Sequence, residues 1–281
     1  MQPGVSLANK QQLLHFAVVG GGPTGVEFAA ELHDLMADDL SRYYPSLSSI
    51  AQITVYDVAD RLLGGFDLSL SKYASERFHR QHITVRTNVS VSSVGKTSLT
   101  LRNGEEIPTG MTVWATGLAP SRLVKDGISE ALRDIKTGRL LVNDRLHLLS
   151  LQKHEYGNAF ALGDCALVES QPGLPCTAQL AKQQAQYLSR RLNKAEHGPF
   201  EFHPLGMMAY VGGWRAVADI IPPSSLTKSK EGQIHSRQSG RMTWLLWRSA
   251  YFSMAVSTRN KLLIPMYWFL TWIFGRDISK I

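Results

Sequence analysis

The stretch at residues 15–27 reads HFAVVGGGPTGVE. A short apolar run, predicted to be a strand, enters a G-x-G-x-x-G motif that then opens a helix. Gly20 permits the tight turn, Gly22 lets the backbone approach a pyrophosphate, and Gly25 lets the helix pack close to the strand. The free N–H groups of the helix N-terminus then face the anion. This order predicts a dinucleotide-binding unit; the alternative is a glycine turn with a purely structural role.

An acidic residue follows the next predicted strand, at residues 53–56. The carboxylate of Asp57 can accept hydrogen bonds from ribose hydroxyls and repels a 2′-phosphate, so NADH is favoured over NADPH. The interval from the motif exceeds the usual ~20 residues, and residues 38–49 are interpreted as an insertion that extends the helix and its loop. The alternative is that Asp57 caps a turn.

Composition narrows the class of protein. The chain has 281 residues, 44% of them hydrophobic and 19% charged, as in a folded protein of one or two domains. The net charge of +7 suggests an acidic partner, and anionic lipid is favoured because no basic run with interleaved aromatic residues indicates nucleic-acid binding. Cys165 and Cys176 lack C-x-x-C spacing, which argues against a disulfide reductase. The histidines lack metal-ligand spacing, so no metal site is expected.

Further predicted elements follow the first two strands. They are a helix at 68–80, a strand at 83–87, a meander at 89–107 with a tight turn at Asn103-Gly104, and a buried strand at 111–115. This order predicts a nucleotide-binding module at residues 12–117.

A second segment covers residues 118–205. It contains predicted strands at 140–142 and 159–162 and a helix at 177–192. The packing face of this helix is predicted to consist of Ala178, Ala181, Ala185 and Leu188. Residues 222–240 are polar and rich in turn formers, and are predicted to be a flexible loop.

The segment from Arg241 to Ile281 differs in composition, with four of the six tryptophans interspersed with basic residues. Its longest uncharged run, residues 262–275, is shorter than the ~20 apolar residues that span a bilayer. Trp and Tyr flanked by Arg and Lys are typical of helices that lie at a membrane surface. We therefore predict a monotopic helix pair on an anionic membrane surface. A core helix or a dimer interface is the alternative. The N-terminal residues carry no targeting signal.

Several motifs together resemble one family. They are Val18–Glu27, Trp114–Gly117, Gly157–Asp164, Pro175–Gln183, Tyr210–Asp219, Trp247–Tyr251 and Trp272–Ile278. In this order they look like the type II NADH dehydrogenases, the single-subunit NADH:ubiquinone oxidoreductases of mitochondria. The resemblance implies an α/β, Rossmann-like flavoprotein fold that binds two dinucleotides.

The resemblance also implies roles for individual residues. NADH is expected on Gly20, Gly22, Pro23, Thr24, Gly25 and Asp57, with Glu27 near the nicotinamide. Ala115, Thr116 and Gly117 are expected to pass near both nucleotides, and Gly163 and Asp164 to contact FAD. Gln179 and Gln183 share one helix face and are expected near the flavin ring and the quinone head group. The alternative for the two glutamines is ordinary helix-surface polarity. Glu27, Gln179 and Gln183 are the implied catalytic residues.

One feature departs from the family pattern. The family carries two dinucleotide motifs, and this chain has one, which its neighbours identify as the NADH motif. The N-terminal FAD half is therefore expected to be missing. Residues 12–117 are expected to bind NADH, 118–205 to form the remaining part of the FAD domain, and 206–281 to form the quinone and membrane-anchoring region.

The expected function is FAD-dependent oxidation of NADH with electron transfer to ubiquinone in the respiratory chain, without proton pumping. The expected location is the mitochondrial inner membrane, as a peripheral or monotopic protein, with a homodimer as one arrangement. Two rivals remain open: a non-catalytic NADH-binding protein of the membrane surface, and a soluble pyridine-nucleotide oxidoreductase. Flavin content separates the first rival from the enzyme.

Overall fold

The computed structural model describes residues 4–194, 198–221 and 235–276, which form two compact units. The first unit holds the described residues of Met1–Thr116, Gly206–Ile220 and Ile234–Ile281; the second holds those of Gly117–Leu205 and Ile221–Gln233. The glycine motif and the aromatic C-terminal segment therefore belong to the same unit.

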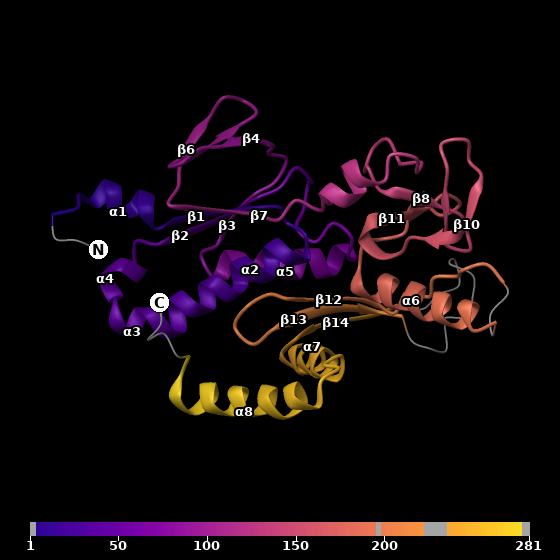
Figure 1. The fold of residues 1–281 in the computed structure, drawn as a ribbon. Helices are drawn as coiled ribbons and strands as arrows, with labels where there is room; N and C mark the ends of the chain where they lie inside the picture. The colour runs from indigo at the N-terminus through magenta and orange to yellow at the C-terminus, as the bar shows by residue number, and fades with distance from the viewer. Residues whose placement is uncertain (1–3, 195–197, 222–234, 277–281) are drawn as a thin grey trace. The chain divides into compact units, whose positions relative to one another are not determined.

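A parallel sheet forms the centre of the first unit, in the order β3-β2-β1-β7 (Figure 1). Its strands are β1 (His15–Val19), β2 (Gln52–Tyr56), β3 (Thr84–Arg86) and β7 (Met111–Trp114). β1 pairs with both β2 and β7, and its residues Ala17, Val18 and Val19 are buried, because a central parallel strand is covered on both faces. The predicted α/β class is confirmed.

Helices α2 (Pro23–Asp34) and α5 (Leu68–Arg80) follow β1 and β2. The apolar face of each helix, which includes Val26 of α2 and Phe78 of α5, is buried in one core cluster. α1 (Leu7–Leu13) precedes β1. The predicted insertion is helical, and it consists of η1 (Leu35–Leu40), α3 (Ser41–Tyr43) and α4 (Pro45–Ser48).

Two antiparallel sheets of three strands complete the first unit. The predicted meander contains β4 (Val91–Val94), β5 (Ser98–Leu101) and β6 (Glu106–Pro108). The other sheet contains β12 (Gly206–Tyr210), β13 (Ala216–Ile220) and β14 (Ser236–Gly240), and it is followed by α7 (Arg241–Ser253) and α8 (Thr258–Phe274).

Strand β14 corrects part of the loop predicted at 222–240. Residues 222–234 lie outside the described residues, but Ser236–Gly240 pairs antiparallel with β13 from Ile220 back to Ala216. The strand could not be predicted from the polar sequence of β14. An edge strand is held by backbone hydrogen bonds and needs few apolar side chains.

The second unit contains a mixed sheet in the order β10-β9-β8-β11. Its elements are η2 (Leu123–Gly127), β8 (Leu140–Val142), β9 (His147–Leu149), β10 (Glu155–Phe160), η3 (Gly163–Cys165), β11 (Ala166–Val168) and α6 (Ala178–Leu192). The strand predicted at 159–162 is corrected to β10, since its pairing with β9 begins in the polar stretch at Glu155.

The buried face of helix α6 only partly matches the predicted one, since Leu188 packs against the core as predicted. Leu180, Gln184 and Tyr187 are its buried residues, whereas Ala178 and Ala185 are exposed. The buried spacing of i, i+4 and i+7 is typical of an amphipathic helix. The large side chains fill the core, whereas Ala181 is half-buried and only Ala178 and Ala185 face outward.

Candidate nucleotide-binding site

The glycine motif forms a tight cradle between β1 and α2. Gly20 has a φ of +113°, and a Cβ there would overlap the carbonyl oxygen of Ala115. A Cβ on Gly25 would overlap the carbonyl oxygen of Gly20. Both positions therefore require glycine, for backbone conformation at the first and for close packing at both. This geometry confirms the strand–turn–helix expected of the motif.

The start of α2 leaves space and donors for an anion. A Cβ on Gly22 would meet nothing within 4 Å, and Gly22, as the N-cap, provides no side-chain hydrogen bond to the helix. Pro23 and Thr24 follow in the exposed first turn. Helix N-termini leave backbone N–H groups without intrahelical partners, so these residues fit a pyrophosphate. That Gly20, Gly22, Pro23, Thr24 and Gly25 hold NADH stays a prediction.

Asp57 lies at the carboxyl end of β2, against the cradle. One carboxylate oxygen accepts a hydrogen bond from Gly21 N, and the other accepts one from Ala59 N at 2.6 Å. The second contact caps a turn. The alternative prediction, that Asp57 caps a turn, is therefore confirmed for this contact. Its ribose contact stays a prediction, and the position at the carboxyl edge of the sheet supports it.

The strand end at residues 115–117 lies partly against the same cradle. Ala115 N donates to Val19 O at 2.7 Å, which extends β7 alongside β1 up to the glycine turn. Gly117 has a φ of +127°, a conformation that favours glycine. The expected approach of Ala115, Thr116 and Gly117 to both nucleotides stays a prediction.

Glu27 is a residue of α2 and faces β12 and α7. Its Oε1 accepts hydrogen bonds from Tyr210 N at 3.0 Å and from Trp247 Nε1 at 3.1 Å. Burial raises the pKa of Glu27 above its usual value, although these two hydrogen bonds lower it. The rings of Tyr210 and Trp247 stack at 5.6 Å between centroids. Glu27 is therefore held in an aromatic setting, and its position near the nicotinamide stays a prediction.

Sequence reasoning missed a second buried carboxylate on α2. Asp34 is 5% exposed and accepts a hydrogen bond from the Tyr210 hydroxyl at 2.5 Å and from Gly213 N at 3.1 Å. Burial and the neighbouring Asp34 raise the pKa of the Tyr210 hydroxyl. The helical spacing could have predicted this carboxylate, since Asp34 is seven residues from Glu27 and lies on the same face of the helix.

In the second unit, Gly163 turns the chain at the start of η3. Its φ is +73°, and its buried N–H donates to Gln184 Oε1 at 2.7 Å. Asp164 follows and is exposed. Gln184, which sequence reasoning missed, thus closes the turn from the buried face of α6. The pair Gly163 and Asp164 fits a flavin contact, with an exposed carboxylate beside a fixed turn, and this role stays a prediction.

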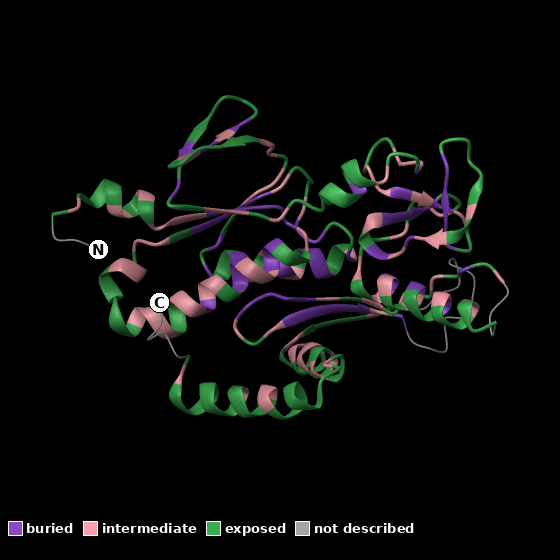
Figure 2. Ribbon diagram, in the orientation of Figure 1, coloured by how far each residue is buried: buried purple, intermediate pink, exposed green. Residues whose placement is uncertain are grey.

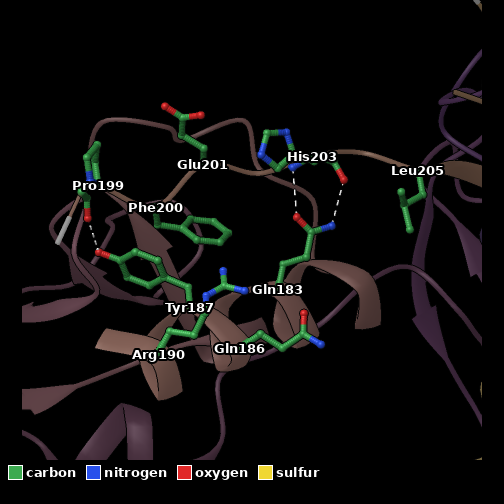
Figure 3. Close-up of a pocket in the computed structure, with 10 residues that line it drawn as sticks. Gln183, Gln186, Tyr187, Arg190, Pro199, Phe200, Glu201, His203 and Leu205 are labelled. Atoms are coloured by element: carbon green, nitrogen blue, oxygen red, sulfur yellow. Dashed lines mark hydrogen bonds between the residues drawn. The ribbon is translucent and has the colours of Figure 1, made fainter. Parts of the chain in front are cut away.

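Gln179 and Gln183 lie on one face of α6, as expected. Gln179 Oε1 accepts a hydrogen bond from Leu205 N at 2.9 Å. The amide of Gln183 forms two bonds with the backbone of His203, at 2.8 and 3.0 Å (Figure 3). Both side chains therefore bind the extended segment beside the helix. Their contact with flavin and quinone stays a prediction.

A pocket of about 530 Å³ lies between α6 and this segment (Figure 3). Its lining includes Gln183, Gln186, Arg190 and His203. The lining combines polar and apolar side chains, and all of its residues belong to the second unit.

The C-terminal helices expose many large apolar side chains. Figure 2 shows that α8 is exposed along most of its length, and none of its described residues is buried. The guanidinium of Arg248 lies 4.8 Å from the Trp244 ring and 3.8 Å from the Trp268 ring, so it joins α7 to α8. No helix among the described residues is long and apolar enough to cross a bilayer.

A glycine cradle at the carboxyl edge of a parallel sheet defines a dinucleotide-binding oxidoreductase fold. Residues 4–185 match the family model of pyridine nucleotide-disulphide oxidoreductases, and residues 205–277 match that of the NDH2 C-terminal domain. The chain belongs to the pyridine nucleotide-disulphide oxidoreductase family. These matches confirm the resemblance to type II NADH dehydrogenases.

Individual relatives agree with this assignment. The chain is 37% identical to a probable NADH dehydrogenase of Dictyostelium discoideum, over 99% of this chain and 58% of that protein. It is 34% identical to the mitochondrial internal alternative NAD(P)H-ubiquinone oxidoreductase A1 of Arabidopsis thaliana, over 99% and 55%. With external NADH-ubiquinone oxidoreductase 2 of Saccharomyces cerevisiae the identity is also 34%, over 96% and 53%. The chain thus spans little more than half the length of these relatives.

A solved structure shows the same fold. The structure of NDH2 from Plasmodium falciparum in complex with NADH matches 98% of this chain and 69% of that chain, with a TM-score of 0.85 and 23% sequence identity. At this identity the match concerns the fold alone.

Proposed function

We propose that this chain supplies the NADH-binding and C-terminal parts of a type II NADH:quinone oxidoreductase, which oxidises NADH and reduces ubiquinone. The observation that carries the proposal is the cradle of Gly20, Gly22 and Gly25, with Asp57 at its edge. Relatives named as NADH- and NAD(P)H-ubiquinone oxidoreductases support the choice of reaction.

The residues of the cradle, Asp57 and Glu27 each have a proposed role in holding NADH. The cradle and the first turn of α2 bind the pyrophosphate through backbone N–H groups. The Asp57 carboxylate orients the ribose, and the aromatic setting of Glu27 keeps its carboxyl in place near the nicotinamide. These contacts position the hydride donor.

FAD is the proposed second cofactor. When bound, it would supply the two-electron redox chemistry that links NADH to the quinone. Gly163 and Asp164 would hold it at the turn before β11, and the face of α6 that carries Gln179 and Gln183 would line the flavin and the quinone head group. From the resemblance to the type II family we also propose that the enzyme does not pump protons.

The test uses the whole chain, purified in detergent and incubated with FAD. We expect it to retain a flavin spectrum that bleaches on addition of NADH, and to oxidise NADH with a short-chain ubiquinone analogue. NADH binding without any retained flavin would show that this chain alone is not the dehydrogenase and would favour the rival NADH-binding protein of the membrane surface. Reduction of a disulfide substrate, with no quinone activity, would favour the soluble oxidoreductase.

We also propose that α7 and α8 bind an anionic membrane surface, in keeping with the mitochondrial names of the relatives. Trp272 is 71% and Phe274 79% exposed, while Arg241, Arg259 and Lys261 add positive charge to the same two helices. Aromatic and apolar side chains combined with basic ones suit the head-group region. The proposed location is the mitochondrial inner membrane, with a peripheral or monotopic attachment.

A Trp272→Glu variant is expected to bind anionic phospholipid vesicles about tenfold more weakly, because it brings a negative charge to the membrane surface. Vesicle co-sedimentation measures this effect. The matched control is Ile135→Glu, which makes the same kind of change at a fully exposed apolar residue of the second unit. Equal weakening in both variants would contradict the assignment to the membrane. If the wild type binds no vesicles and forms a homodimer that dissociates in Trp272→Glu, the surface belongs to a dimer interface instead.

A further inference from the structure

A second charged residue lies at the sheet edge that is proposed to receive the ribose. Arg86, the last residue of β3, is the register partner of Tyr56 in β2. Its carbonyl oxygen accepts a hydrogen bond from Asp57 N at 3.0 Å. Arg86 and Asp57 therefore end neighbouring parallel strands, and in α/β sheets such ends line the ligand crevice.

The guanidinium of Arg86 is already occupied. Nη1 donates to Glu105 Oε1 and Nη2 donates to Glu105 Oε2, each at 2.9 Å. The same guanidinium lies 5.6 Å from the centre of the Tyr56 ring. Glu105 is itself held in the turn between β5 and β6, where its N–H donates to Asn103 Oδ1 at 3.0 Å. The meander thus presents a fixed carboxylate to the arginine.

A guanidinium binds a phosphate with the same two-pronged geometry that it uses for a carboxylate. NADPH differs from NADH by a 2′-phosphate on the adenosine ribose, the sugar that the carboxylate after the second strand contacts. Names of the relatives include both NADH and NAD(P)H, so family membership leaves the choice of nucleotide open. The residues around Asp57 must make that choice.

We propose that Glu105 is a specificity-determining residue that selects NADH by occupying the Arg86 guanidinium. With Glu105 in place, a 2′-phosphate meets the Asp57 carboxylate and finds no free cation in Arg86. With Glu105 neutralised, the Arg86 side chain turns to the 2′-phosphate. The proposal rests on the proposed binding of NADH at this cradle.

The test compares the binding of ADP and of 2′,5′-ADP, which carries the additional phosphate, by calorimetry. In Glu105→Gln we expect the affinity for 2′,5′-ADP to rise about tenfold relative to ADP, the effect of one charge-assisted contact. The double variant Arg86→Ala/Glu105→Gln should lose this gain. Both side chains are partly exposed, so the variants should fold, and thermal unfolding monitors this.

Glu106→Gln is the matched control, because it removes the same charge from the exposed neighbouring residue and leaves the Arg86 pair intact. An equal gain in Glu106→Gln, or a gain that survives removal of Arg86, would overturn the proposal and reduce the effect to net charge. Unchanged selectivity in Glu105→Gln would overturn it too. A wild-type chain that binds neither NADH nor ADP would contradict the proposed function itself, and the specificity proposal with it.

Discussion

A Gly25→Ala variant is expected to lose about 3 kcal/mol of unfolding free energy, because overpacking at a rigid contact is costly. The new Cβ would overlap the carbonyl oxygen of Gly20 and approach Val18 Cγ1 to 3.3 Å. These atoms belong to the turn and to buried β1, so α2 must move away from the sheet. NADH binding should be lost with the cradle. Urea unfolding and NADH fluorescence titration measure the two effects.

The matched control for this variant is Gly22→Ala, three residues earlier in the same motif. Gly22 has a φ of −73°, and a Cβ there would meet no atom within 4 Å. We expect its stability to stay within about 0.5 kcal/mol of the wild type. NADH affinity should nevertheless fall about tenfold, an effect of roughly 1.4 kcal/mol, because the Cβ enters the space that the pyrophosphate approaches. Undiminished NADH binding by Gly22→Ala would place the nucleotide elsewhere.

The second large effect is expected at the buried carboxylate of Asp34. An Asp34→Ala variant should lose about 3 kcal/mol of unfolding free energy, because it leaves the Tyr210 hydroxyl and Gly213 N without their acceptor. Tyr210→Phe removes one donor to Asp34 and the acceptor of Trp214 N at 3.3 Å, leaves the carboxylate its bond from Gly213 N, and should cost less. Equal stability of Asp34→Ala and the wild type would show that the contact between α2 and the turn after β12 contributes nothing.

The same carboxylate gives a pH dependence. Burial raises the pKa of Asp34, but hydrogen bonds from His33, Tyr210 and Gly213 outweigh it and leave the pKa below its usual value. A lowered folded-state pKa stabilises the protein above the unfolded pKa of about 3.9, and this contribution is lost as the pH falls below it. We expect wild-type stability to drop more steeply below about pH 4 than that of Asp34→Asn. Parallel pH profiles would contradict this role.

Much of the first unit could be predicted from local patterns. Four predicted elements match the structure: the strands at 53–56, 83–87 and 111–115 are β2, β3 and β7, and the helix at 68–80 is α5. They could be predicted because a strand–turn–helix order with apolar runs has few alternatives. The buried face of α6 was predicted only in part. Alanine is compatible with either face of a helix, and only the surrounding core decided that Leu180, Gln184 and Tyr187 turn inward.

Sequence patterns could not predict contacts between residues that are distant in the chain. The glutamines of α6 were identified correctly as neighbours on one face, but their bonds to the backbone at His203 and Leu205 depend on how the chain returns to the helix. Strand β14 was missed for a similar reason, since its polar side chains carry no periodic signal and its pairing depends on β13.

The sequence by itself determined the glycine cradle, the parallel strands around it and the family, because these depend on residues that are close in the chain and on backbone conformations that glycine allows. Only the tertiary structure decided which partners the charged side chains take. Asp34 is joined to Tyr210, Glu27 to Trp247 and Arg86 to Glu105. The first two pairs join residues more than 170 positions apart in the chain. A buried or partly buried charge must find a partner wherever the fold supplies one, and that choice is made by packing rather than by sequence spacing.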